Sequence, residues 1–254
     1  MEGLAGRTAL VTGAGRGLGA AFARGLAAYG VSVGVLDIDG DTATATANEI
    51  SDTGARAVGL IADISDRSAV LEAITSCEDA LGRVDILINN AGFGTTPETA
   101  GLAWHEWPED AWDAVIDCNL KGAFLACQAV APKMMERGWG RIVNVSSATV
   151  WHPLANGAAY IASKAGLIGL TRSLATGVGE HGVTVNTLVP GLTKTDHMAN
   201  LYPDEQFESF AQLRAIPRVE LPADLVGTAL FLCSDASAFV TGQSFVVDGG
   251  HVFD

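Results

Sequence analysis

The chain alternates short apolar stretches with longer segments of helical periodicity. We expect strands at 8–11, 31–37, 56–63, 84–92, 141–147, 183–191 and 243–250, and helices at 17–30, 41–54, 66–81, 109–137, 157–181 and 222–234. Strands that are apolar on both faces are typical of a parallel sheet covered by helices on each side. The pattern therefore predicts one α/β domain over residues 1–254, a doubly wound parallel sheet of about seven strands.

Two segments are longer than ordinary connections, namely 93–110 and the stretch from Pro190 to about Arg218. Long loops in compact domains usually act as lids or binding loops. Residues 193–215, which we call the lid segment, mix polar and apolar residues directly after Pro190 and Gly191. We predict that this segment closes over a substrate, whereas the sequence suggests no role for 93–110.

Composition and charge narrow the range of partners. With 254 residues, of which 48% are hydrophobic and 17% charged, the chain can bury a substantial core. A net charge of −14 would repel a polyanion, so we expect no nucleic-acid partner. No apolar run reaches the roughly 18 residues that span a bilayer, and the first residues lead directly into a strand pattern. We expect a cytoplasmic protein without a membrane partner.

The cysteines and histidines show no spacing typical of a metal site. There is no CxxC and no HExxH, and the five histidines are scattered. The cysteines lie within apolar or helical patterns, which favours reduced, packed thiols over disulfides. These are Cys77, Cys118, Cys127 and Cys233.

A glycine-rich stretch, "TGAGRGLG" at 12–19, joins the first strand to the first helix. Gly13 would permit a tight turn, Gly17 would let the backbone approach a pyrophosphate, and Gly19 would let the helix pack on the strand. Asp37 closes the second strand, where an acid can bind the hydroxyls of a ribose. Either feature could have a local role only, the glycines as a turn and Asp37 as a cap. Together they favour NAD.

Tyr160 and Lys164, in "YIASK", would lie one helical turn apart on the same face. Taken alone, the pair could be a core tyrosine beside a surface lysine. The chain also contains, in order, "NNAG" (89–92), "NLKG" (119–122), "VSS" ending at Ser147, "PGLTKT" (190–195) and "TGQSFVVDGG" (241–250). With these motifs, the whole chain resembles the short-chain dehydrogenase/reductase family. Residues 215–250 are similar to those of secondary aryl-alcohol (1-phenylethanol) dehydrogenases.

The resemblance implies a Rossmann-type fold and a catalytic tetrad of Asn119, Ser147, Tyr160 and Lys164. Tyr160 would be the general acid/base, because a nearby cation favours its phenolate. Lys164 would also hold the cofactor ribose, and Ser147 would bind the substrate oxygen. Asn119 would hold a water that links Lys164 to solvent. Ser146 could replace Ser147, but the thirteen-residue spacing to Tyr160 selects Ser147.

By the same resemblance, a set of residues along the strand ends would bind the cofactor. Asp37 followed by Ile38 favours NAD, whereas Arg16 could pair with the 2′-phosphate of NADP. Asp63 could instead be a turn acid and Asn90 a backbone brace. The full set is Gly13, Arg16, Gly17, Leu18, Gly19, Asp37, Ile38, Asp63, Ile64, Asn90, Ala91, Gly92, Tyr160, Lys164, Pro190, Gly191, Thr193 and Thr195.

The expected substrate pocket is mostly apolar and aromatic, which favours a hydrophobic or aryl secondary alcohol or ketone over a sugar. The resemblance also implies a homotetramer. Alternative functions are a 3-oxoacyl-[acyl-carrier-protein] reductase and a non-catalytic nucleotide sensor on the same fold. The predicted pocket residues are Phe93, Val150, His152, Leu154, Leu192, Met198, Tyr202 and Phe207.

Overall fold

The computed structural model of the chain describes residues 1–96 and 98–253. Its centre is a seven-stranded sheet in the order β3-β2-β1-β4-β5-β6-β7, and every neighbouring pair is parallel. This confirms the predicted sheet. The strands are β1 (Thr8–Thr12), β2 (Ser32–Asp37), β3 (Ala57–Ile61), β4 (Ile86–Asn89), β5 (Gly140–Val145), β6 (Val183–Pro190) and β7 (Ser244–Val247).

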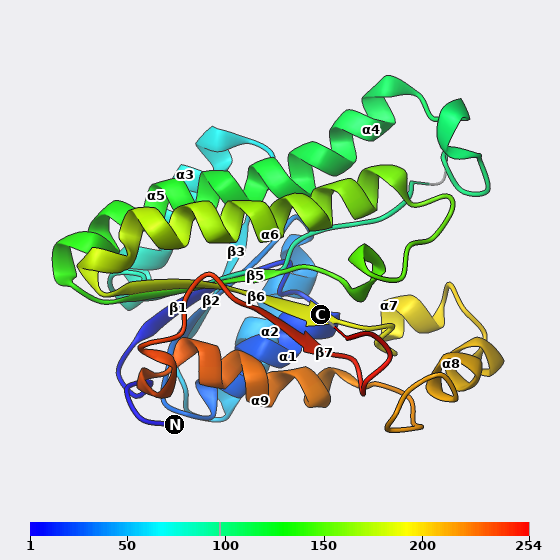
Figure 1. Cartoon of the computed structure of the whole chain (residues 1–254). Helices are drawn as coiled ribbons and strands as arrows, with labels where there is room; N and C mark the ends of the chain where they lie inside the picture. The colour runs from blue at the N-terminus through cyan, green and yellow to red at the C-terminus, as the bar shows by residue number, and fades with distance from the viewer. Residues whose placement is uncertain (97, 254) are drawn as a thin grey trace.

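Helices cover both faces of the sheet (Figure 1). One face carries α1 (Gly17–Ala27), α2 (Gly40–Asp52) and α9 (Pro222–Cys233). The other carries α3 (Arg67–Leu81), α4 (Glu109–Ile116), α5 (Gly122–Arg137) and α6 (Ala158–Val178). Short 3₁₀ turns lie at 104–106, 148–150, 179–181 and 235–237.

Alternating strand residues fill two separate cores. Val11 packs in the cluster under α1 and α9, whereas its neighbour Leu10 packs in the cluster under α3 and α5. Ile88 and Leu87 in β4 divide in the same way. Because both faces are buried, each strand reads as a continuous apolar run, which is why the sequence pattern locates them.

Several helix ends follow from local capping chemistry. The carboxylate of Asp39 accepts main-chain hydrogen bonds from residues 41 and 42, and Asp66 does the same for residues 68 and 69. Both satisfy N–H groups that a first helical turn leaves free. At the other end, Gly138 ends α5 in the left-handed region, with φ 67°, which a glycine adopts without strain.

The long helix predicted over 109–137 is interrupted by a π-helical turn at Asp117–Lys121. By length and composition, Glu109–Arg137 is apolar enough to cross a membrane. In the structure it packs on the sheet, with Ala126, Val130 and Met134 almost completely buried. It is therefore a core helix of the fold.

The predicted loop after Pro190 contains two short helices, α7 (Asp196–Ala199) and α8 (Asp204–Ala211). The sequence pattern missed them because α8 buries only Phe207 and Ala211, too few residues to establish a helical period. Figure 1 shows both helices at the end of the molecule where β6 leaves the sheet.

The four cysteines are free thiols, and Cys77, Cys127 and Cys233 are buried. Burial raises the pKa of each of these three thiols to about 12. Reactive cysteines have a lowered pKa and some exposure. These thiols therefore act as small apolar groups in the core.

At the amino-terminal edge of β5, buried Arg141 donates to the carbonyls of Ser234, Gly140 and Gly182. We expect Arg141→Met to lower the free energy of unfolding by about 1–3 kcal/mol, because buried acceptors lose their donor. Denaturant unfolding would measure the loss. The matched control is Arg56→Met, which removes one exposed bond to Ala80. Equal losses in both variants would contradict this role.

Candidate active site

The segments that leave β1, β4, β5 and β6 meet at the carboxyl edge of the sheet. The strand order places β1 beside β4, where the connections diverge to opposite faces of the sheet. In open α/β sheets, ligands bind in the crevice at such a point. The predicted glycine loop, "NNAG" and Ser147 therefore lie along one edge although they are far apart in sequence.

Lys164 lies beneath this edge and is 4% exposed. Its ammonium donates a 2.9 Å hydrogen bond to the carbonyl of Val145, the last residue of β5, and lies 5.6 Å from the centre of the Tyr160 ring. A side chain at Gly92 would crowd this place, because its Cβ would lie 2.9 Å from the Asn119 amide oxygen and 3.1 Å from the Lys164 nitrogen. The predicted helical pair is thus a buried cation beside a phenol.

Burial shifts the pKa values of both groups toward their neutral forms. Desolvation lowers the pKa of Lys164 to about 8, so the ammonium remains mostly charged at pH 7. Desolvation also raises the pKa of Tyr160, while a hydrogen bond with the Ser147 side chain lowers it. Perturbed groups that gather in one place are typical of acid/base sites.

Ser147 is buried directly after β5, and its oxygen accepts a 3.0 Å hydrogen bond from the Thr149 hydroxyl. The neighbouring Ser146 hydroxyl donates instead to the main-chain carbonyl of Lys164. Of the two candidate serines, Ser147 is the one whose side chain hydrogen-bonds to Tyr160. Ser146 ties the strand end to α6.

Asn119 lies in the π-helical turn and is 1% exposed. Its amide oxygen accepts from the Phe93 N–H, and its amide nitrogen donates to the Phe93 carbonyl and the Ser163 hydroxyl. Both the oxygen and the nitrogen of the Asn119 amide thus bond to protein groups. These bonds join the segment after β4 to α6. Its predicted part in a water relay stays a prediction.

The glycine loop has the shape that a dinucleotide phosphate requires. Gly13 and Gly17 have φ values of 60° and 59°, a region that glycine adopts freely. A Cβ on Gly19 would lie 2.2 Å from the Gly13 carbonyl oxygen, so α1 can begin at the loop only with glycine there. The residues present fit a nucleotide phosphate at the amino terminus of α1.

Asp37 is buried at the end of β2 and braces this loop. One carboxylate oxygen accepts from the Gly15 N–H at 2.9 Å, and the other accepts from the Asp39 N–H at 3.1 Å. Arg16 and Ile38 are exposed beside it. The carboxylate is therefore fixed at the place where an adenosine ribose is expected.

Other predicted cofactor residues have visible structural partners. Asn90 donates to the carbonyls of Thr12 and Gly13, so it braces the glycine loop. Asp63 is exposed and caps a turn through Ser65, and buried Ile64 packs where Gly122 leaves room.

The predicted pocket residues come from three segments of the chain, at 93, 150–154 and 192–207. From the lid segment, Tyr202 lies close enough to raise the pKa of Tyr160. Phe207 is fully buried beneath it, with ring centres 6.4 Å apart, so it supports the lid segment from within. His152 and Leu154 are exposed at the outer rim.

Residues 7–206 match the family model of the short chain dehydrogenases. The chain belongs to this family. As a short-chain dehydrogenase with a Rossmann fold, it binds a nicotinamide cofactor.

Relatives with assigned names cover nearly the whole chain. A Thauera aromatica protein named (2S)-[(R)-hydroxy(phenyl)methyl]succinyl-CoA dehydrogenase subunit BbsD is 41% identical, over 98% of this chain and 97% of the relative. A 3-oxoacyl-[acyl-carrier-protein] reductase from a Synechocystis species is 39% identical over 99% of each chain. The crystal structure of a Brucella melitensis 3-oxoacyl-[acyl-carrier protein] reductase with bound NAD has a TM-score of 0.87, at 32% identity over 97% and 92% of the two chains. This short-chain dehydrogenase is thus an oxidoreductase acting on CH–OH groups.

Sequence reasoning missed several residues of this short-chain dehydrogenase that lie at the site's border. A Cβ on Gly94 would lie 3.7 Å from the Tyr160 ring. His251 packs 4.8 Å from His152 and 5.9 Å from Phe210 of α8. Arg214, near the end of the lid segment, is buried, and so are Glu220 and Asp248, which follow that segment in the chain. Only the "VDGG" turn before His251 gave a sequence signal, and it identified a strand end.

We expect Tyr160→Phe to lower kcat by at least about 10²–10⁴-fold, the effect of losing a general acid/base, with NADH binding retained. As a general base, Tyr160 would act through its phenolate, and burial raises the pKa of Tyr160. Oxidation by the wild type should therefore accelerate as pH rises. Steady-state kinetics and NADH fluorescence would test both points. Tyr29→Phe, at an exposed phenol, is the control, and near-normal turnover by Tyr160→Phe would refute the assignment.

Proposed function

We propose that this short-chain dehydrogenase is an NAD-dependent enzyme that interconverts a secondary alcohol and a ketone on a small hydrophobic or aromatic substrate. The main support for this proposal is the buried Lys164 ammonium, which lies 5.6 Å from the centre of the Tyr160 ring. Ser147 hydrogen-bonds to the same phenol. This arrangement suits moving one proton to or from an alcohol oxygen.

Each group has a distinct task in this proposal. Tyr160 takes the hydroxyl proton during oxidation and returns it during reduction. The Ser147 hydroxyl orients the substrate oxygen and stabilises charge that develops on it. Lys164, still mostly charged at pH 7 because its pKa is about 8, favours the phenolate electrostatically.

The cofactor would lie along the carboxyl edge of the sheet. The glycine loop would hold the pyrophosphate and Asp37 the adenosine ribose, while Lys164 would hold the second ribose. When bound, the nicotinamide supplies the acceptor or donor of the hydride. The loop at Pro190 and Gly191 would cover the nicotinamide face and exclude water.

The pocket composition and one relative support an aryl substrate. The expected lining contains Phe93, Leu192, Met198 and Tyr202, which suit an apolar group. The name of the Thauera relative describes an alcohol that bears a phenyl group, and residues 215–250 resemble aryl-alcohol dehydrogenases. His152, which is exposed and packs against His251, would add a polar group at the outer side.

A 3-oxoacyl-[acyl-carrier-protein] reductase is the second candidate, favoured by the Synechocystis relative. Docking an acidic carrier protein needs a basic surface. This chain has a net charge of −14, and Lys194 at the start of the lid segment pairs with Asp204 at 2.8 Å. The catalytic groups also disfavour a nucleotide sensor. By family resemblance, we further propose a cytoplasmic homotetramer.

A substrate panel separates these candidates. We expect aryl ketones and secondary aryl alcohols to give kcat/KM values about tenfold or more above acetoacetyl thioesters, because burial of a phenyl group contributes a few kcal/mol. Initial rates with NADH or NAD would measure this preference. Preference for the thioester would instead support the reductase function.

Cofactor choice tests the role of Asp37. The 2′-phosphate of NADP would place a dianion against this carboxylate, so the wild type should prefer NAD on the order of 100-fold in kcat/KM. The double variant Asp37→Ser, Ile38→Arg should shift strongly toward NADP, because Arg16 and the new arginine can bind the phosphate.

The matched control for this switch is Asp39→Asn. It removes one half-buried negative charge two residues away and preserves the helix cap. It should leave cofactor preference unchanged. A wild type that uses NAD and NADP equally well would show that Asp37 does not select the cofactor.

A further inference from the structure

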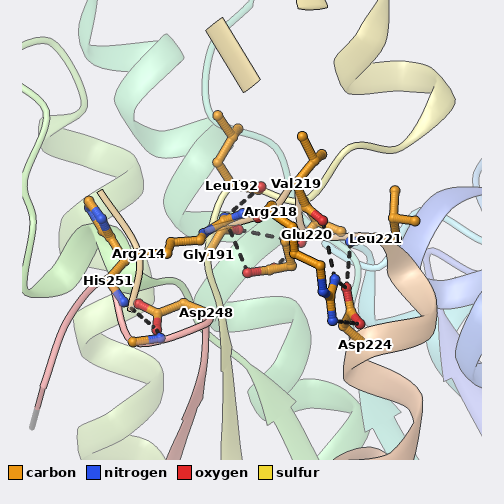
Figure 2. Close-up of polar contacts among 12 residues, drawn as sticks. Gly191, Leu192, Arg214, Arg218, Val219, Glu220, Leu221, Asp224, Asp248 and His251 are labelled. Carbon is orange, nitrogen blue, oxygen red and sulfur yellow. Dashed lines mark hydrogen bonds and ion pairs between the residues drawn. The ribbon is translucent and has the colours of Figure 1, made fainter. Parts of the chain in front are cut away.

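One buried carboxylate joins the two ends of the lid segment. Glu220, between the lid segment and α9, is 4% exposed. One of its oxygens accepts a 2.5 Å hydrogen bond from the Thr193 hydroxyl. The other lies 3.3 Å from the guanidinium of Arg214 (Figure 2). Thr193 and Arg214 stand at the beginning and near the end of the lid segment, so Glu220 contacts both.

Further hydrogen bonds connect Glu220 and Arg214 to the main chain at both ends of the lid segment. The Lys194 N–H donates to the Glu220 carbonyl at 2.8 Å. Arg214 donates to the carbonyls of Leu192 and Arg218, each at 3.0 Å. An arginine offers several donors in one rigid plane, so it fixes the geometry of its acceptors. We call Thr193, Arg214 and Glu220 the lid anchor.

The C-terminal segment holds the outgoing end from a second side. The Asp248 carboxylate accepts hydrogen bonds from the N–H groups of residues 250–252. The turn that it stabilises accepts from the N–H groups of Ala215 and Ile216, at 3.2 and 2.8 Å. The end of the lid segment is therefore attached to the turn after β7 as well as to Glu220.

The anchor lies directly against the loop after β6. A Cβ on Gly191 would lie 2.8 Å from a Glu220 carboxylate oxygen and 3.2 Å from Arg214. Beyond the anchor, a hollow of about 220 Å³ borders Arg214, Glu220 and Asp248. This end of the lid segment is held by hydrogen bonds from the Arg214 guanidinium and from the N–H groups of Ala215 and Ile216.

The lid anchor contributes little to the free energy of unfolding for the number of charged groups that it buries. Burial raises the pKa of Glu220 to about 6, although Thr193 and Arg214 act in the opposite direction. Buried ion pairs are a weak source of stability, because desolvation offsets their attraction. Between the anchored ends, Leu201 and Leu213 are 59% and 61% exposed. The ends are thus fixed while much of the intervening surface is open.

We propose that Glu220 is a positioning residue: with Thr193 and Arg214 it fixes both ends of the lid segment, so that residues 194–213 move as one flap that brings Tyr202 over Tyr160. Its effect on catalysis rests on the proposed function, but its effect on the lid segment does not. The geometry also gives the Thr193 hydroxyl a protein partner in place of the predicted cofactor contact.

Hydrogen exchange of the full chain with saturating NADH tests the anchor directly. Glu220→Ala should speed exchange in residues 194–213 by about tenfold, with β6 and α9 unchanged, because a lost buried hydrogen bond shifts a local opening by that order. Thr193→Val should give a smaller increase in the same residues, and Thr193→Ser should restore wild-type exchange. Adding Thr193→Val to Glu220→Ala should have little further effect, since both remove one interaction.

The matched control is Asp204→Asn, which removes the more exposed lid ion pair with Lys194 and should leave exchange near the wild-type rate. In kinetics, Glu220→Ala should raise the alcohol KM about tenfold and change kcat less. Unchanged lid exchange in both Glu220→Ala and Thr193→Val, or faster exchange throughout the sheet, would overturn the proposal. An inactive wild type would refute the proposed function alone, because exchange still measures the anchor.

Discussion

The burial of both faces of a parallel sheet is the constraint on which this molecule depends. Successive residues such as Leu10 and Val11 enter opposite cores, so both faces are lined mainly by apolar side chains. The polar side chains buried there, such as Asn89 and Asn144, hydrogen-bond to one another. Parallel strands also send all their carboxyl ends to one edge. The segments after β1, β4, β5 and β6 therefore converge there, and main-chain groups at strand ends become available to hold side chains and ligands.

The Lys164 ammonium makes use of this edge. Its acceptor is the carbonyl of Val145 at the end of β5, and Gly92 after β4 leaves the space that it occupies. Burial pushes Lys164 and Tyr160 toward their neutral forms, but a phenolate and an ammonium stabilise each other when they are close. In the proposed function, this pairing allows Tyr160 to release its proton and to take it back.

The lid segment follows a different physical rule. Its interior depends on one buried ring, Phe207, and on the contact of that ring with Tyr202. Its ends depend on charged and polar groups, with Glu220 at the centre. Elements with few buried apolar contacts open locally at low free energy. Fixed ends and a lightly packed interior are properties expected of a segment that must admit and enclose a substrate.

Much of the fold was readable from the sequence because it is encoded locally. Continuous apolar runs identified the strands, and the glycines at 13 and 17 adopt positive φ values, as a tight phosphate-binding turn requires. The spacing of Tyr160 and Lys164 placed both on one face of α6. Each of these features depends on neighbours within a few residues, which a sequence pattern records directly.

Tertiary structure alone decided the contacts between distant segments. The π-helical turn places Asn119 against Phe93 and Ser163. Glu220 accepts a hydrogen bond from Thr193, which lies at the other end of the lid segment in the sequence. The sequence pattern also did not predict the short helices α7 and α8 or the contact between His251 and His152. A hydrogen bond between residues far apart in sequence leaves no period in the chain, because its energy depends on where the whole fold brings the two groups.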